Sequence, residues 1–255
     1  MKILKAKIKK SLYGYKVYTY IDNCDNFDKK SNFVDLDGER DYEQESVNRA
    51  KRQAIDYGIN NIWDYFITIT FDIKKINRYD YELCLKKVKK AFNNYKFNQS
   101  SNFKYLIIPE LHELKIGEEK AAIHFHGLVS GIRECDVKFI KNSKKYHNSV
   151  YSFLPMYNRF GTTNLIPIKN QTENVTYYIC KYICKAGRLL KKSFYASNGL
   201  KTSEEVLNSD SNNMLIPNLN TLISNGFSPS YCSSFCTIYD IPAELIPILD
   251  NTIDI

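Results

Sequence analysis

Residues 121–129 read AAIHFHGLV. In an extended chain the side chains alternate between two faces, so His124 and His126 would share one face and the apolar residues between them the other. A second apolar, extended segment covers Tyr105–Glu110. We therefore expect residues 104–130 to form an antiparallel hairpin in which two imidazoles lie on one face.

Other segments fill in an α+β pattern around this hairpin. Residues 66–71 read FITITF, whose alternation of aromatic and β-branched residues is typical of a strand. Apolar residues recur at helical spacing in 45–59 and 79–95, and a long helix is expected over Thr172–Leu190. A shorter helix is predicted at 134–145. The order of the strands does not follow from these patterns.

Composition favours an anionic partner. The 255 residues carry a formal net charge of +8 and include 20 Tyr and 14 Phe. Lysines mixed with tyrosines suit contacts to phosphates and stacking on unpaired bases, so nucleic acid is the first expectation. A solvated basic surface, or the codon bias of an AT-rich genome, would give a similar composition.

The cysteines and the hydropathy indicate the compartment. None of the seven cysteines stands at zinc-finger spacing, and the charged N-terminal segment does not resemble a secretory signal. No apolar run approaches the roughly 18 residues of a membrane span. We expect a protein of the reducing cytoplasm with no membrane partner.

The histidine pair is a candidate metal site. His124 and His126 would lie about 7 Å apart on one strand face, which allows both imidazoles to bind one cation. Two surface histidines on a half-buried strand would give the same pattern.

A third ligand is expected from the partner strand of the hairpin. Glu110 ends that strand and ranks first, because its carboxylate would complete a set of two histidines and one acid. His112 and Glu113 remain alternatives, because Pro109 disturbs the alternation of side chains.

The predicted helix over 172–190 has two distinct stripes. At about 100° per residue, one arc of roughly 100° contains Tyr178, Lys181, Tyr182 and Lys185. The opposite arc is apolar and would face the core. A free tyrosine, with a pKa of about 10, is a poor nucleophile at neutral pH, but a nearby metal ion and ammonium groups favour its phenolate. An ordinary amphipathic helix is the alternative.

Taken in order, these segments resemble the HUH endonucleases, specifically the rolling-circle replication initiators of plasmids and single-stranded DNA phages. The first motif of that family is similar to residues 66–72, FITITFD, and the histidine triplet to residues 124–126, HFH. The Tyr-x-x-Lys motif occurs twice, at 178–181 and 182–185. The resemblance spans roughly residues 45–200.

The resemblance implies a fold and a domain organisation. The expected fold is α+β, a central antiparallel sheet of about five strands in a split βαβ (ferredoxin-like) arrangement, with helices on one face and the active site on the open face. The nuclease domain would occupy residues 45–200. Residues 1–44 would form a basic arm and loop, and residues 201–255 a partly irregular C-terminal extension.

It also implies a mechanism. The two histidines and Glu110 would hold Mg²⁺ or Mn²⁺. Tyr178 would attack the scissile phosphate of single-stranded origin DNA to form a 5′-phosphotyrosine link and a free 3′-hydroxyl, and Tyr182 would serve in a second cleavage. Lys181 and Lys185 would contact phosphate or metal-bound water. Thr68 and Thr70 would belong to a structural strand under the site.

The resemblance further implies partners. No phosphate loop of an ATPase is visible, so strand separation would need a host helicase, and a DNA polymerase would extend the 3′-hydroxyl in a bacterial host cytoplasm. The alternatives are a relaxase or transposase of the same superfamily, a DNA-binding regulator that has lost cleavage, and a small-molecule metalloenzyme.

Overall fold

The computed structural model describes residues 3–12, 14–21, 42–112, 114, 120–144, 148–169, 172–183, 192–210, 221, 223–224, 226–232 and 236–245. The chain divides into two compact units. The larger unit is Tyr42–Lys201, and the smaller combines Met1–Asp41 with Thr202–Ile255.

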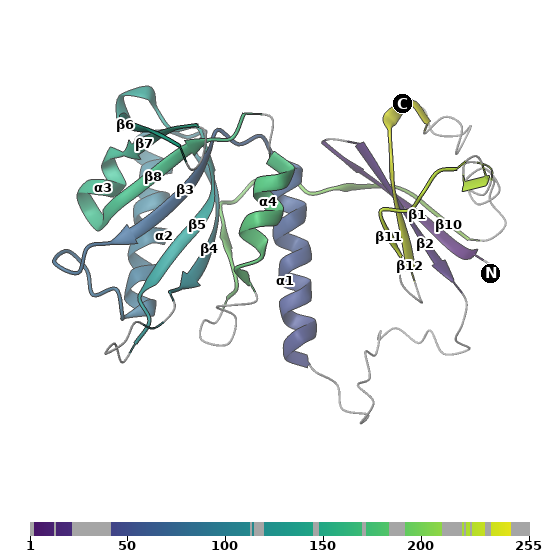
Figure 1. Cartoon of the computed structure of the whole chain (residues 1–255), viewed down its shortest axis with the longest axis horizontal. Coiled ribbons are helices and arrows are strands. Elements are labelled where there is room, and N and C mark those ends of the chain that lie inside the picture. Colours follow the sequence, from purple (N-terminus) through teal and green to yellow (C-terminus); the bar gives the residue numbers. More distant parts are fainter. Residues whose placement is uncertain are drawn as a thin grey trace. The chain divides into compact units, whose positions relative to one another are not determined.

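A seven-stranded antiparallel sheet forms the centre of the larger unit, in the order β6-β7-β8-β3-β5-β4-β9 (Figure 1). Its strands are β3 (Tyr65–Phe71), β4 (Lys104–Leu111), β5 (Ile123–Ser130), β6 (Val137–Ser143), β7 (Asn148–Phe153), β8 (Gly161–Pro167) and β9 (Tyr195–Ala196). Strand β5 is antiparallel to both β3 and β4, so these two strands run parallel on either side of it. Helix α2 (Tyr81–Asn98) connects β3 to β4, which is the split βαβ arrangement.

Helix α2 covers one face of this sheet. It begins where the Asp80 side chain accepts a hydrogen bond from the backbone N–H of Leu83, which satisfies one of the free donors of the first turn. Its apolar side packs on the sheet, and Phe92 makes edge contacts with Phe103 and Tyr105. The short helix α3 (Leu154–Phe160) contributes Met156 and Phe160 to the same core.

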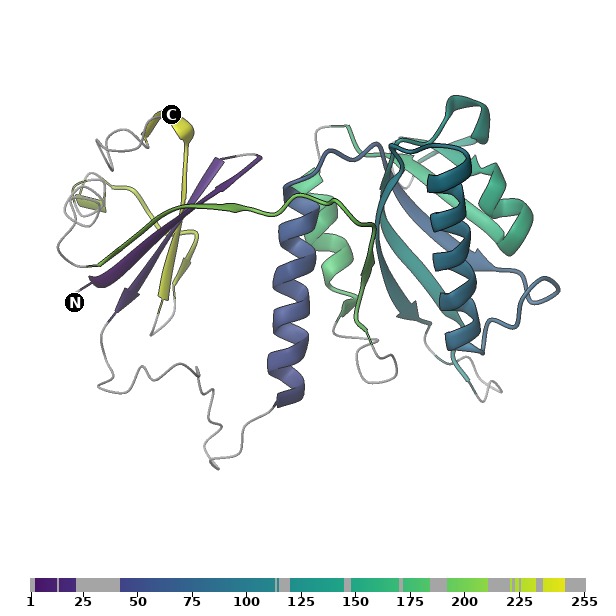
Figure 2. The same cartoon turned by 180° about the vertical axis from the view of Figure 1, so that it is seen from behind.

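Helices α1 (Tyr42–Ile59) and α4 (Thr172–Cys180) pack on the opposite face (Figure 2). Their core contains Ala54 of α1, Ile179 of α4 and Leu128 of β5. The two helices approach closely at Gly58, because a Cβ there would collide with the side chain of Thr176. This contact fixes α4 against α1 and hence above the sheet.

The α+β class and the hairpin within residues 104–130 are confirmed. The sheet, however, has seven strands rather than about five, and helices cover both of its faces rather than one. The helix predicted at 134–145 is wrong. Only the turn η1 (Glu134–Asp136) is helical, and the next segment pairs with β7 as strand β6, where its β-branched and aromatic residues extend the sheet.

The smaller unit contains a five-stranded sheet in the order β10-β1-β2-β12-β11. Its elements are β1 (Ile3–Ser11), β2 (Gly14–Ile21), β10 (Glu204–Asp210), β11 (Tyr231–Cys232), β12 (Cys236–Ile241) and the turn η2 (Ala243–Leu245). Both chain ends therefore build one sheet, and β10 is a regular strand inside the extension predicted to be partly irregular. No helix in the described parts of the chain is long and apolar enough to cross a membrane.

Candidate active site

Strands β3, β4 and β5 place a row of polar side chains on one face of the larger sheet. His124 of β5 is directly opposite Thr70 of β3 and Glu110 of β4. His126 is directly opposite Thr68. Opposed residues of antiparallel strands point to the same face, so all five side chains share the face that packs against α1 and α4.

Strand β4 keeps its alternation through Pro109. The pairing with β5 runs through Pro109 opposite Phe125 and Glu110 opposite the first histidine, with no shift of register. The proline therefore does not move Glu110 off the histidine face. His112 follows the end of β4, and the alternative ligand Glu113 lies outside the described residues.

A threonine hydroxyl holds each histidine ring. Oγ1 of Thr70 is hydrogen-bonded to Nδ1 of His124 at 3.0 Å, and Oγ1 of Thr68 to Nδ1 of His126 at 3.1 Å. These bonds fix the ring orientations and engage Nδ1 of both rings. Nε2 is then the atom through which either imidazole would bind a ligand.

Two further side chains meet these rings. Oε2 of Glu110 lies 2.6 Å from Nε2 of His126, a hydrogen-bonded ion-pair geometry. The ring of His112 lies with its centroid 3.7 Å from that of His124, and its backbone N–H donates to the carbonyl of Ala122 at 3.0 Å. Three imidazoles and one carboxylate thus gather at the ends of β4 and β5.

The environment keeps both strand histidines neutral. Burial lowers the pKa of His124 to about 3, and the nearby charges of His112, His126 and Arg78 act in the same direction. Burial also lowers the pKa of His126, although Glu110 opposes this change. A neutral imidazole has the free lone pair that metal binding requires.

This donor set fits a divalent cation in chemical type, because it offers two Nε2 atoms and one carboxylate. Within the described residues, no group of three or more His, Cys, Asp or Glu side chains is arranged to hold a metal ion. The cause lies in the pairing just described, since Glu110 is bonded to His126 and His112 is stacked on His124. Metal binding would require the Glu110 carboxylate to turn away from His126.

Helix α4 brings the two tyrosines to the histidines. Ile179 and Cys180 are buried against the sheet, so Tyr178 is on the exposed side of the helix. The helix ends at Cys180, and a tighter turn follows in which the N–H of Tyr182 donates to the carbonyl of Ile179 at 3.1 Å. This turn lays the Tyr182 ring on His126, with centroids 4.8 Å apart and planes 21° from parallel.

Phe66 completes an aromatic cluster at this point. Its ring stacks on His126 at a centroid distance of 5.8 Å and meets the Tyr178 ring edge-on at 5.9 Å. The hydroxyl of Tyr182 donates a hydrogen bond of 2.7 Å to the hydroxyl of Tyr178. Both tyrosines are therefore held beside the strand that carries the histidines.

The two lysines of the predicted stripe differ in what the structure describes. Lys181 lies in the turn after α4, and its side chain is exposed. Lys185 and the rest of the helix predicted to reach Leu190 fall within residues 184–191, which lie outside the described residues.

Sequence reasoning missed the partners that orient the histidines. Thr68 and Thr70 were expected to be structural residues only, yet both hydroxyls are bonded to imidazole nitrogens. Alternation along β3 puts them on the same face as Phe66, but only the pairing of β3 with β5 shows that this face carries the histidines.

Comparison with known proteins gives one match. No curated protein and no solved structure is significantly similar to the chain. A family of replication-associated proteins, described by its member ORF2, matches residues 64–187. The matched region runs from the start of β3 past α4, and it contains every candidate residue placed above. Over these residues the chain is similar to that family of replication-associated proteins.

Proposed function

We propose that the protein is a replication initiator that nicks single-stranded origin DNA by tyrosine attack and later rejoins the strand. The observation that carries this proposal is the stacking of Tyr182 on His126, with Tyr178 hydrogen-bonded to Tyr182. This arrangement holds a pair of nucleophilic hydroxyls beside neutral imidazoles. The match to replication-associated proteins over residues 64–187 supports a role in DNA replication.

In the proposed reaction, the hydroxyl oxygen of Tyr178 attacks the scissile phosphorus in line with the bond to the 3′-oxygen. The new bond joins phosphorus to the tyrosine oxygen, and the phosphorus–O3′ bond breaks. The phenolic proton passes to solvent, and the departing 3′-oxygen takes up a proton to become a free 3′-hydroxyl. The 5′-phosphotyrosine link conserves the phosphodiester energy, so attack by a 3′-hydroxyl can reverse the step and rejoin DNA.

The side chains divide the remaining work. Nε2 of His124, Nε2 of His126 and the Glu110 carboxylate would hold Mg²⁺ or Mn²⁺, whose charge would polarise the scissile phosphate. Thr68 and Thr70 keep the imidazoles in position. Lys181 and Lys185 would contact the phosphates.

Tyr182 has two proposed roles. Its hydroxyl donates to the oxygen of Tyr178, so it can support the phenolate that leaves when the strand is rejoined. It can also act as the nucleophile of a second cleavage. The free 3′-hydroxyl would serve a host DNA polymerase and the nicked strand a host helicase, in the cytoplasm of a bacterial host.

The test is formation of a covalent adduct. The protein is incubated with single-stranded oligonucleotides from its own replicon and Mn²⁺, and a protein–DNA band is sought on a denaturing gel. We expect a band that EDTA prevents and that the double change Tyr178→Phe/Tyr182→Phe abolishes. A metal-dependent band that survives the double change would refute the nucleophile assignment.

Tyr177 provides a matched control. It neighbours Tyr178 and has a similar exposed fraction, 43% against 46%, but belongs to the other side of the stripe. Tyr177→Phe should leave the band unchanged. His124→Ala should abolish the band while DNA binding persists. DNA binding by the unaltered protein without a band on any replicon strand would favour the regulator.

A further inference from the structure

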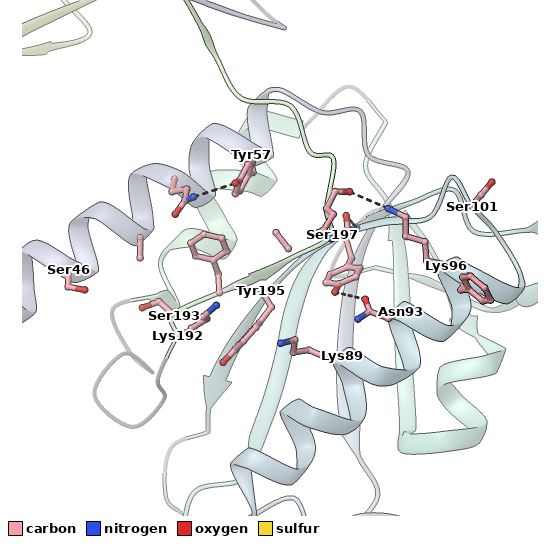
Figure 3. Close-up of a pocket in the computed structure, with 17 residues that line it drawn as sticks. Ser46, Tyr57, Lys89, Asn93, Lys96, Ser101, Lys192, Ser193, Tyr195 and Ser197 are labelled. Carbon is pink, nitrogen blue, oxygen red and sulfur yellow. Dashed lines mark hydrogen bonds between the residues drawn. The ribbon is translucent and has the colours of Figure 1, made fainter.

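The larger unit has a second cationic feature, an open groove of about 940 Å³. It lies between helices α1 and α2 along strand β9, and Figure 3 shows Lys89 and Tyr195 facing the space between α2 and β9. We call it the edge groove. The described residues that line it belong to segments 46–57, 89–105 and 192–198, and none of them is a residue of the candidate active site.

The edge groove is positively charged. Lys89, Lys96 and Lys192 line it, and the described lining residues include no Asp or Glu. Nζ of Lys96 donates to the carbonyl oxygen of Asn198 at 3.2 Å, and Nζ of Lys89 lies 5.3 Å from the centre of the Tyr195 ring. A carbonyl and an aromatic ring orient these ammonium groups without neutralising them, so the charge remains available to an anion.

The same groove presents aromatic surface. Phe97 is 89% exposed, which is unusual for a large apolar side chain that has no ligand to cover. Phe194 meets Tyr57 edge-on at a centroid distance of 6.2 Å. Lysines set among aromatic rings are the combination that binds unpaired nucleotides, because the lysines contact phosphates while the bases stack on the rings.

We propose that the edge groove binds a segment of single-stranded DNA that flanks the cleavage site. Duplex DNA fits the groove less well, because its base faces are already stacked on one another and cannot reach Phe97. The inference rests on the proposed function for the choice of DNA as the ligand. The groove itself is defined by its own charge and aromatic surface.

The sheet connects the edge groove to the candidate active site. Tyr195 of β9 pairs with Ile107 of β4, and Glu110 lies three residues further along β4, a rise of about 10 Å. A single strand of several nucleotides is long enough to contact both places, since single-strand sites commonly cover roughly 4 to 16 nucleotides. One strand can therefore occupy the active site and the edge groove together.

Binding to fluorescein-labelled oligothymidylate tests the proposal, measured by fluorescence anisotropy in EDTA so that no cleavage is needed. Lys89→Ala/Lys96→Ala is compared with Lys87→Ala/Lys90→Ala, which removes the same charge from the same helix at exposed positions that do not line the groove. We expect the groove variant to lose at least about tenfold in affinity and to lower the salt slope by about 1.4, or about 0.7 for each lost phosphate contact. The control should change far less.

Phe97→Ala gives an independent reading, because a side chain that is 89% exposed can be removed without disturbing the core. Loss of one stacked base should weaken binding about fivefold or more. An oligothymidylate of about 15 nucleotides should bind the unaltered protein more tightly than one of about 5. The groove variants should lose this advantage of length.

Equal affinities of the groove variant and its control would overturn the proposal. It would also fail if duplex DNA or polyglutamate displaced the probe as well as unlabelled single strand does. Failure of the proposed function gives a different result, because the unaltered protein would then form no adduct with replicon strands in Mn²⁺, whatever the edge groove binds in EDTA.

Discussion

The hydroxyl of Tyr182 donates a hydrogen bond of 2.7 Å to the hydroxyl of Tyr178. The two nucleophile candidates are thus coupled, and their single substitutions should differ in effect. Tyr178→Phe removes the proposed first nucleophile and should abolish the adduct on a first-cleavage substrate. Tyr182→Phe removes only a donor to that nucleophile and should slow adduct formation by about fivefold to tenfold, the effect of one lost hydrogen bond. Single-turnover gel assays measure both rates, and equal loss in the two variants would contradict this division of roles.

The threonine–histidine contacts lead to a second prediction. Thr70→Val keeps the shape of the side chain but removes the hydroxyl bonded to Nδ1 of His124. Groups that orient a metal-binding histidine typically contribute a factor of about 10 to 100 in metal affinity. Thr70→Val should therefore raise by about that factor the Mn²⁺ concentration needed for adduct formation. Thr70→Ser, which retains the hydroxyl, should behave like the unaltered protein, and an unchanged Mn²⁺ requirement in Thr70→Val would remove the threonine from the site.

Local patterns in the sequence predicted the elements of the site, and long-range pairing determined what they contact. The strand at 66–71 and the hairpin at 104–130 follow from alternation, which is a property of neighbouring residues. Thr70 is opposite His124 only because β3 pairs with β5, across a separation of 54 residues. Such pairing depends on tertiary packing, so the role of Thr70 could not be read from its own strand.

The same distinction explains the misplaced elements. Strand β10 pairs with β1 from the other end of the chain, where Lys9 faces Glu205 and Lys10 faces Glu204. A strand made largely of polar residues gives a weak local signal, and its cross-strand charge pairs become visible only when the partner is known. The helix prediction over segment 137–143 failed for a related reason, because an exposed edge strand lacks the clean alternation of a half-buried one.

The close approach of α1 and α4 gives a third prediction. A Cβ at Gly58 would collide with Cγ2 of Thr176, so Gly58→Ala should displace α4 and destabilise the protein by about 1–3 kcal/mol, the usual cost of overpacking. Adduct formation should also fall, because α4 positions Tyr178. Chemical unfolding and the gel assay measure the two effects. Thr176→Ala removes the colliding atom, so the double variant should recover much of both losses, and a double variant no better than Gly58→Ala would show that the close contact is not the cause.

A buried carboxylate at the turn before β6 sets a fourth prediction, on acid stability. Oδ2 of Asp136 accepts hydrogen bonds from the Tyr95 hydroxyl at 2.7 Å and from Nε of Arg133 at 2.8 Å. Burial alone would raise the pKa of Asp136, but the bonds from Arg133 and Tyr95 outweigh it, and the pKa is lowered. Because the folded-state pKa lies below the unfolded value of about 3.9, the carboxylate stabilises the fold above that pH, and this contribution is lost as the pH falls through the folded-state pKa.

Asp136→Asn should therefore reduce the free energy of unfolding by about 1–2 kcal/mol at pH 7, the magnitude for hydrogen bonds to a charged group. The difference from the unaltered protein should shrink as the pH falls below about 4. Urea unfolding at both pH values measures it. Glu134→Gln, which removes the same charge from an exposed neighbour two residues away, should change stability little at either pH. A deficit in Asp136→Asn that is equal at pH 7 and at low pH would mean that the ionised carboxylate is not what stabilises this turn.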